Sequence, residues 1–262
     1  MGYIFSAPYE TYGKVGGRTL GEQGATTAGL VYLSNQVDET DRTIEQSWRL
    51  GLQEAGLDLD DGNIHAVGVE KTNFDDVVTS LRLAGVDAIG TILDATAMKR
   101  LEQSMARSGY DPIHVSSPFG GDPEVVNDPN VGGAFDGTFV LSDVHFLGSG
   151  VPEVERYESE VGRRFGGDAE LNWAGQHGWL GARFFVEALS AAGEDPTREK
   201  ILEFMDSRRD HETGMTVPLS ITDDPRSHNK NNLCMRVGKV VDGKVQTVAD
   251  WSCPELTLDG DL

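Results

Sequence analysis

The chain has 262 residues, of which 38% are hydrophobic and 25% charged, and its formal net charge is −21. This length is sufficient for one large domain or two smaller ones, each with its own core. The negative charge argues against nucleic acids and anionic membrane surfaces as partners, because both would repel the protein. The sequence contains no apolar run of about 18 residues, so no membrane insertion is predicted. Residues 1–7 also lack the basic start and long apolar centre of a secretory signal.

The first half of the chain alternates between short apolar segments and segments with helical periodicity. After an extended segment over residues 1–7, the pattern predicts a helix over 9–24 and then strands over 28–33, 64–69, 87–93, 113–116 and 134–141, with helices over 41–55, 73–84 and 95–108 between the first four strands. Strands that alternate with helices of about 12 residues predict a parallel, doubly wound α/β sheet.

The second half begins with three helices that have no strand between them. We expect them over residues 151–165, 172–192 and 197–206, and the middle one is the longest. Its apolar residues form two stripes at helical spacing, which comprise Trp173, His177, Leu180, Phe184, Ala188 and Ala191 in the first and Trp179, Ala182, Val186 and Leu189 in the second. An apolar surface of this width predicts that the helix lies between two layers.

The remaining strands are expected over residues 215–221, 235–241 and 244–251, and the last two form a hairpin around Asp242-Gly243. Cys234 and Cys253 flank this hairpin on opposite strands, about two residues out of alignment. A disulfide between them is plausible if the strand ends carry a bulge or fray. Two free thiols in the core are the alternative. A disulfide would place the protein outside the reducing cytosol.

No motif for catalysis, a cofactor or a metal is found. The sequence lacks a phosphate-binding loop, a dinucleotide fingerprint and a Gly-x-Ser-x-Gly nucleophile elbow. The six histidines are scattered without the spacing of a zinc motif. His177 lies among aromatic residues and is expected to be a hydrogen-bonded core histidine rather than a ligand. We therefore predict no catalytic residue, no metal and no cofactor.

Polar residues follow three of the predicted strands. Ligands of open parallel sheets bind at the carboxyl ends of the strands, where this chain places Ser34, Asn35 and Gln36, then Asp94, Ala95 and Thr96, then Ser116 and Ser117. Asp94 could receive a ligand ammonium group. The alternative is that these residues cap the helices that follow, which explains Asp94 equally well.

Several segments resemble a known family when their order is considered. Residues 73–81 (NFDDVVTSL) and 85–89 (GVDAI) resemble the second lobe of type I periplasmic solute-binding proteins, in the branch that binds branched-chain amino acids, amides and related compounds for ABC transporters. Residues 185–189 (FVEAL), 192–193 and 197–200 (TREK) are similar to the late helices of that family, and residues 237–248 to its terminal hairpin. The resemblance extends over nearly the whole chain.

The resemblance implies two doubly wound lobes, joined by three crossings, that close on a small ligand. Full members begin with further residues that form most of the first lobe, so this chain is expected to start near the first crossing. The implied division is an inter-lobe crossing over residues 1–10, a complete second lobe over 11–142, helices of a partial first lobe over 143–215, and a return crossing with the hairpin over 216–262. On this basis one side of the helix over 172–192 should lack cover, and Trp173, Trp179 or Phe184 should be unusually exposed.

The resemblance transfers few binding residues. The family often has an aromatic residue where this chain has Thr40, which argues against a branched-chain amino acid as ligand. The family's acidic residue that meets a ligand amino group falls in residues 117–122, where Ser117, Phe119 and Asp122 are candidates. The complete set of predicted ligand-binding residues is Asn35, Gln36, Thr40, Asp94, Thr96, Ser117, Phe119 and Asp122.

The function expected from these features is an extracytoplasmic receptor that captures a small polar organic molecule, such as an amino acid or an amide, for an ABC importer. Its partners would be the ligand and the permease subunits, in the periplasm or at the outer cell surface, with lipid anchoring of the full-length protein left open. The alternative is a ligand-sensing module of the same fold that feeds a regulator. An enzyme is the third hypothesis, and no sequence motif supports it.

Overall fold

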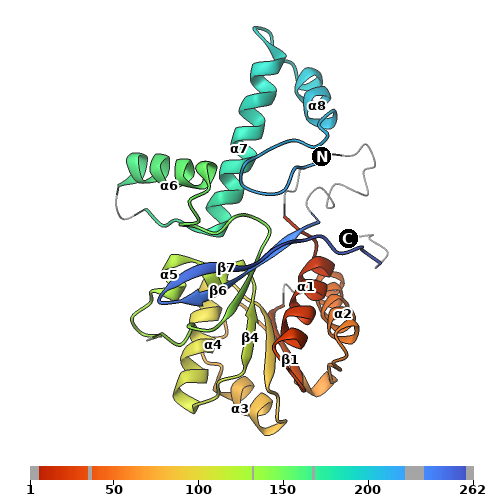
Figure 1. Ribbon diagram of the computed structural model, residues 1–262, viewed down its shortest axis with the longest axis vertical. Helices are drawn as coiled ribbons and strands as arrows, with labels where there is room; N and C mark the ends of the chain where they lie inside the picture. The colour runs from red at the N-terminus through yellow and green to blue at the C-terminus, as the bar shows by residue number, and fades with distance from the viewer. Residues whose placement is uncertain (1–5, 35–36, 132, 167–168, 222–232, 258–262) are drawn as a thin grey trace.

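The computed structural model describes residues 6–34, 37–131, 133–166, 169–221 and 233–257. In this structure a sheet flanked by helices occupies one end of the molecule, and the later helices of the chain project from it (Figure 1). Asn35 and Gln36, two of the predicted binding residues, lie outside the described residues.

One sheet contains all seven strands of the described residues, in the order β2-β1-β3-β4-β5-β6-β7. The strands are β1 (Ala28–Leu33), β2 (Ile64–Val67), β3 (Ala88–Ile92), β4 (Ile113–Ser116), β5 (Phe139–Ser142), β6 (Met235–Val241) and β7 (Lys244–Ser252). Strands β1 to β5 pair in parallel. The terminal hairpin adds β6 and β7 as antiparallel strands at one edge.

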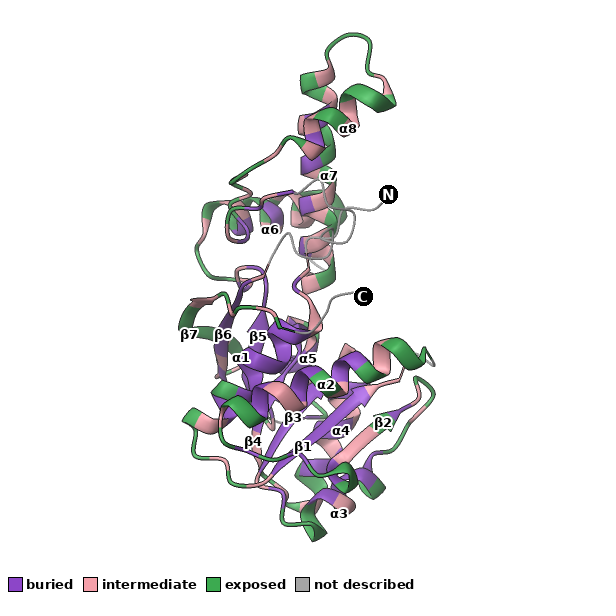
Figure 2. Ribbon diagram, turned by 90° about the vertical axis from the view of Figure 1, so that its right-hand side faces the viewer, coloured by how far each residue is buried: buried purple, intermediate pink, exposed green. Residues whose placement is uncertain are grey.

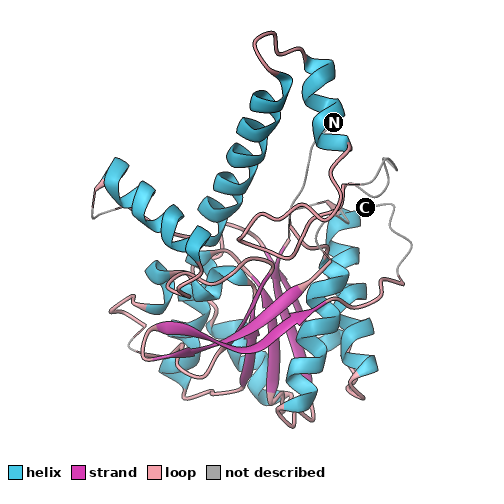
Figure 3. Ribbon diagram, turned by 45° about the horizontal axis from the view of Figure 1, so that its top comes forward, coloured by secondary structure: helices cyan, strands magenta, loops and turns pink. Residues whose placement is uncertain are grey.

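Helices cover both faces of the sheet, as Figure 3 shows. One face packs against α1 (Tyr9–Glu22) and α2 (Asp38–Glu54), and the other against α3 (Asp75–Leu83), α4 (Ala95–Ser108) and α5 (Pro123–Val126). The inner strands β1 and β3 are buried on both sides, which is why they read as short apolar runs without alternation. The predicted doubly wound α/β fold is confirmed.

Glycines let α1 and α2 pack closely. A Cβ atom on Gly51 would lie 1.9 Å from the carbonyl oxygen of Gly13, and one on Gly13 would lie 2.0 Å from the carbonyl oxygen of Ser47. No side chain fits at such distances, so only glycine allows this approach of the two backbones. Trp48 then fills the space between α2 and the sheet, where it is fully buried.

The helices that follow the sheet are α6 (Pro152–Phe165), α7 (Trp173–Ala192) and α8 (Arg198–Asp206), which we call the helical unit. The Asn172 side chain caps α7 by accepting a hydrogen bond of 2.7 Å from the backbone N–H of Gly175. Figure 1 shows α7 rising away from the sheet with α8 beside its far end. Among the described residues, no helix has the length and apolarity needed to cross a membrane.

The two apolar stripes of α7 differ in exposure. Leu180, Phe184 and Ala188 of the first stripe are buried, whereas Val186 of the second is 58% exposed and Ala182 is also exposed. Trp173 and Trp179 are half-buried and Phe184 is buried, so none of the three side chains has the unusual exposure that was expected. The exposed apolar residues of α7 instead include Phe185 and Val186. Figure 2 shows that α7 contains buried, intermediate and exposed residues along its length. The described residues cover one side of α7.

Two predicted strands differ from the structure. Residues 215–221 were expected to form a strand but make only an isolated bridge, between Leu219 and His211. No ladder extends from it, because Pro218 has no N–H to donate and the apolar side chains of Met215 and Ile221 pack into the helical unit instead. Strand β5 also begins later than expected, after a turn at Gly137 with φ of 97°.

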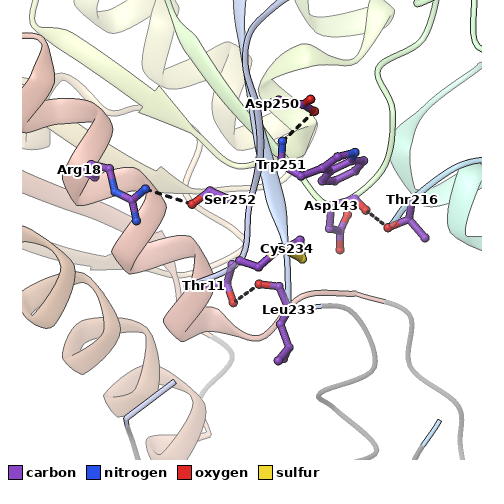
Figure 4. Close-up of a disulfide and its surroundings, with 10 residues drawn as sticks. Thr11, Arg18, Asp143, Thr216, Leu233, Cys234, Asp250, Trp251 and Ser252 are labelled. Atoms are coloured by element: carbon purple, nitrogen blue, oxygen red, sulfur yellow. Dashed lines mark hydrogen bonds between the residues drawn. A yellow bond between two sulfur atoms is a disulfide. The ribbon is translucent and has the colours of Figure 1, made fainter. Parts of the chain in front are cut away.

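A disulfide joins Cys234 and Cys253 at the open end of the terminal hairpin. Figure 4 shows it beside α1, where the hydroxyl of Thr11 donates a hydrogen bond of 3.2 Å to the carbonyl oxygen of Leu233. The register of the hairpin shifts between Met235 and Gly238, and this irregularity brings the two cysteines together. The crosslink thus joins the two ends of the hairpin, and the hydrogen bond from Thr11 holds this end of the hairpin next to α1.

Candidate functional site

Loops at the carboxyl ends of β3 and β4 are held together by Ser117. Its backbone N–H donates to the carbonyl oxygen of Thr91 and its hydroxyl donates to the carbonyl oxygen of Leu93, each at 2.9 Å. The Ser117 side chain is buried and its hydrogen bonds lie within the sheet edge. Ser117 therefore shapes the edge by fixing the loop that contains Asp94.

Asp94 caps α4, which was the alternative to ligand binding that we considered for this residue. Its Oδ1 atom accepts a hydrogen bond of 2.8 Å from the backbone N–H of Ala97. Thr96 lies exposed in the same first helical turn. A carboxylate has several acceptor positions, so a capping Asp94 can still accept a hydrogen bond from a ligand.

Phe119 projects from the short 3₁₀ helix η2 (Pro118–Gly121) toward the helical unit. Its ring meets that of Trp173 edge to face, with centroids 5.2 Å apart and an interplanar angle of 72°. This arrangement is favourable for two aromatic rings. Phe119 is half-buried, so part of its ring stays accessible at the sheet edge.

Asp122 follows η2 and is only 3% exposed. Its Oδ1 atom accepts a hydrogen bond of 2.8 Å from the backbone N–H of Trp173, at the N-terminus of α7. Its Oδ2 atom is buried and has no hydrogen-bond partner. Burial raises the pKa of Asp122 to about 7, because the N–H of Trp173 compensates only in part and Glu124 adds repulsion.

Asp143, directly after β5, was not predicted as a functional residue. It is fully buried, and its carboxylate accepts hydrogen bonds from the indole Nε1 of Trp173 at 2.7 Å and the backbone N–H of Ala7 at 2.8 Å. His177 Nε2 lies 3.1 Å from the same carboxylate. Burial opposes ionisation of Asp143, but the contacts with His177, Trp173 and Ala7 outweigh it and hold the pKa below its ordinary value.

The predicted binding residues do not all meet. Ser117, Phe119 and Asp122 lie along one loop, with Asp94 next to the residue that Ser117 contacts. Thr40 lies half-buried in the first turn of α2, beyond the end of β1, and shares none of the contacts above. His177 is hydrogen-bonded as predicted, although it is partly exposed and its partner is a carboxylate of another segment.

The site shows no arrangement for metal chemistry. In the part of the chain that the structure describes, no three histidine, cysteine, aspartate or glutamate side chains are grouped to hold a metal ion. The groups at the sheet edge are acceptors, hydroxyls and aromatic rings. They can form hydrogen bonds and apolar contacts with a small molecule.

Comparison with known proteins places this architecture in a family. The sequence profile described as "Periplasmic binding protein" matches residues 1–244. No curated protein matches the sequence.

Solved structures share the fold at low sequence identity. They include a fatty acid ABC transporter substrate-binding protein from Thermomonospora curvata (TM-score 0.81, 16% identity, 97% of this chain and 65% of that one). Another is a branched-chain amino acid ABC transporter protein from Thermus thermophilus with bound valine (TM-score 0.80, 15% identity, 96% of this chain and 67% of that one). A solute-binding protein of an ABC transporter from R. palustris in complex with benzoate is also similar (TM-score 0.78, 11% identity, 98% of this chain and 67% of that one).

This chain therefore spans about two thirds of the length of those proteins. The profile match extends over both the sheet and the helical unit, and the solved structures reproduce their arrangement. The chain belongs to the periplasmic binding protein family.

Proposed function

We propose that this protein is a non-enzymatic receptor that captures a small organic molecule, such as an amino acid or an amide, for an ABC importer. In this proposal the sheet with its flanking helices forms one lobe, and the helical unit belongs to the other. The ligand would lie at the carboxyl edge of the sheet, on the side that faces α7.

The observation that carries the proposal is the contact between Phe119 and Trp173. These rings belong to different parts of the molecule, and they meet at the loop that also holds Ser117 and Asp122. Ligand pockets typically combine apolar and aromatic surface with a few polar groups. Phe119 offers the aromatic surface, and Asp94 and Thr96 offer hydrogen-bonding groups.

The ligand class is proposed from the chemistry of this edge. The relatives are described with a fatty acid, valine and benzoate, which are compounds of different character. The candidate residues of this chain include two carboxyl groups and no cation, which favours a ligand with N–H or O–H donors. Thr40, in place of an aromatic residue, favours a ligand other than a branched-chain amino acid.

An extracytoplasmic location and permease subunits as partners also belong to the proposal. Family membership supports both. The disulfide between Cys234 and Cys253 is consistent with an oxidising compartment.

Intrinsic tryptophan fluorescence provides the test, because Trp173 lies beside the proposed site. The protein would be titrated with glutamine, acetamide, valine and benzoate, and isothermal calorimetry would confirm any saturable change. We expect at least one amine or amide to bind with a Kd below about 1 mM, which corresponds to about 4 kcal/mol of binding free energy. Saturable turnover of a bound compound would contradict a non-enzymatic receptor.

Variants then locate the site. Phe119→Ala should weaken binding about tenfold or more, because it removes apolar contact from the ligand. Phe165→Ala is the matched control, since Phe165 is a highly exposed phenylalanine at the end of α6. Equal effects of the two substitutions would place the ligand elsewhere.

A further inference from the structure

Three charged side chains of α1, Glu10, Lys14 and Arg18, are spaced by four residues. Side chains at this spacing lie on one side of a helix. Glu10 and Lys14 are each only 5% exposed, although charged side chains are rarely buried so deeply unless partner groups surround them. This side of α1, which we call the polar stripe, must therefore be in contact with groups that can bind it.

Residues 252–257, which we call the C-terminal strap, provide such groups. Each side chain of the polar stripe contacts one point of the strap: Arg18 donates a hydrogen bond of 3.1 Å to the hydroxyl of Ser252, Lys14 donates one of 2.7 Å to the carbonyl oxygen of Glu255, and Glu10 accepts one from the backbone N–H of Thr257. The first of these contacts is drawn in Figure 4. The strap thus runs along α1 in the direction opposite to the helix.

The length of the strap matches the length of the polar stripe. Glu10 and Arg18 are about 12 Å apart along the helix axis, at about 1.5 Å per residue. A segment from Ser252 to Thr257 spans at most about 17 Å when fully extended. The strap can therefore contact the whole stripe only in a largely extended form, which leaves its backbone carbonyl and N–H groups available to the side chains of α1.

Lys14 is the centre of this contact. An ammonium group has three donors, and two of them can be met by Oε1 of Glu10 at 3.3 Å and Oε1 of Glu54 on α2 at 3.2 Å. The carbonyl oxygen of Glu255, at 2.7 Å, is the partner for the third. Burial lowers the pKa of Lys14, but the contacts with Glu54 and Glu10 outweigh burial and raise it, so the ammonium stays charged. Without the strap, a buried charged group would lose a partner, which is costly.

We propose that the polar stripe of α1 is a binding site for an extended peptide segment, and that residues 252–257 occupy it as a strap that holds the terminal hairpin on α1. The site selects a segment whose carbonyl oxygen accepts from Lys14 and whose N–H donates to Glu10. This inference goes beyond the proposed function, because no small-molecule ligand takes part in it.

The disulfide is the alternative explanation for the position of the strap. It joins Cys253 to Cys234, and the residues that follow could lie along α1 passively. However, the contacts of the polar stripe fall beyond the crosslink, at Glu255 and Thr257. Each further residue adds two rotatable backbone dihedrals, so a tether alone does not fix these positions. We therefore expect the strap to stay bound when the disulfide is reduced.

Cleavage by a glutamyl endopeptidase tests this inference on the full chain. The bond after Glu255 is a suitable reporter, because the Glu255 side chain is exposed whereas its carbonyl oxygen is bound to Lys14. The protease must bind that same oxygen in its oxyanion hole, so cleavage requires the strap to open locally. Mass spectrometry of the intact chain measures the rate at which residues 256–262 are lost.

Lys14→Met should accelerate this cleavage about tenfold or more, because it removes the shortest contact at the centre of the strap. Thr257→Val removes only the hydroxyl contacts with Lys14 and Glu10 and should accelerate it about threefold, even if Lys14→Met does not fold. Lys244→Met, at the turn end of β7, is the matched control and should leave the rate unchanged. Cleavage after the exposed Glu70, which follows β2, monitors opening elsewhere and should be equal in all variants.

Reduction with dithiothreitol separates recognition from tethering. We expect the cleavage rate of the reduced parent protein to rise less than about threefold, because the polar stripe still binds the strap. Unchanged cleavage after Glu255 in both Lys14→Met and Thr257→Val would overturn the binding site. A reduced parent that is cleaved as fast as Lys14→Met would overturn it as well, since the disulfide alone would then position the strap. A failure of ligand binding would leave these rates as expected, so the two proposals fail separately.

Discussion

Gly51 of α2 faces Gly13 of α1 so closely that a Cβ atom on Gly51 would lie 1.9 Å from the carbonyl oxygen of Gly13. Helices in contact are normally separated by side chains, and here two backbones touch instead. The pair sets the distance of α1 from α2 and hence how closely the two helices pack on this face of the sheet.

Gly51→Ala should therefore destabilise the protein. Overpacking typically costs about 1–3 kcal/mol, and the gain of about 1 kcal/mol in helix propensity offsets only part of it. Urea unfolding followed by circular dichroism measures the difference. Gly62→Ala is the control, since no heavy atom lies within 4 Å of the Cβ position there, and it should change stability by less than about 0.5 kcal/mol. Equal stabilities of the two variants would contradict the close packing.

Local patterns predicted most of the secondary structure. The ranges of β1, α4, β4 and β6 agree with the sequence pattern at both ends, because each is a compact periodic or apolar segment with polar or glycine residues around it. Asp94 and Gly109 mark the ends of α4 by a side-chain cap and a left-handed residue, both of which are visible in the sequence.

Contacts between distant segments could not be predicted in the same way. Residues 215–221 have the composition of a strand, but strand pairing requires a neighbour, and here the apolar residues pack among helices. Asp143 is a single aspartate after an apolar strand, and nothing local shows that Ala7, Trp173 and Thr216 surround it. A residue defined by four separate segments has no sequence motif.

For the candidate site, the position of the residues could be predicted from the sequence, but the role of each side chain could not. The sheet edge follows from strand order, so Asp94 and Ser117 were placed there from the strand pattern, whereas Phe119 was a candidate through the family resemblance. Whether such a residue caps a helix, braces a loop or faces a ligand depends on geometry of about 1 Å, which sequence patterns do not contain. The ligand contacts remain predictions.

Because the pKa of Asp122 is raised, we expect this residue to make the stability of the protein depend on pH. The folded state binds the proton more tightly than the unfolded state, in which the pKa is the ordinary 3.8. Stability from this group is thus fully present below about pH 4 and is lost as the pH rises to about 7. With 1.36 kcal/mol per pKa unit between 3.8 and about 7, the loss is about 4 kcal/mol.

Asp122→Asn removes this titration and keeps an oxygen that can accept the Trp173 N–H. Its stability relative to the parent should rise between about pH 4 and 7 and stay constant above. Urea midpoints across this range measure the difference, with Asp58→Asn at an exposed position as control. A difference that does not change with pH would show that the Asp122 pKa is not raised.

The Cys234–Cys253 disulfide at the open end of the hairpin should raise the free energy of unfolding of the protein. Its ends are 19 residues apart, and a loop of this size gives about 3 kcal/mol by the chain-entropy model. The double substitution Cys234→Ala and Cys253→Ala should lower the melting temperature, and reductant should lower that of the parent to a similar value. Reductant should have no effect on the double variant. A parent protein whose melting temperature is insensitive to full reduction would contradict this contribution.

Glu102 and His114 form a buried polar pair between α4 and β4. Glu102 Oε1 lies 2.7 Å from His114 Nδ1, and both side chains are almost fully buried. Thr91 Oγ1 lies 2.9 Å from the other ring nitrogen, Nε2. Replacing one member of such a pair leaves a buried charge or donor without its partner, which typically costs about 3–5 kcal/mol.

A double-mutant cycle tests whether these two groups stabilise each other. Glu102→Leu and His114→Phe should each be strongly destabilising, whereas the double variant should be more stable than the sum of the two effects predicts, because neither polar group is then left alone. Urea unfolding of the four proteins gives the coupling free energy. Thr91→Val, which removes the contacts of the Thr91 hydroxyl with His114 Nε2 and with the sulfur of Met98, should cost about 1 kcal/mol. Additive effects in the cycle would mean that Glu102 and His114 are each compensated by other groups, and their proximity would then contribute nothing to the stability of the α4 layer.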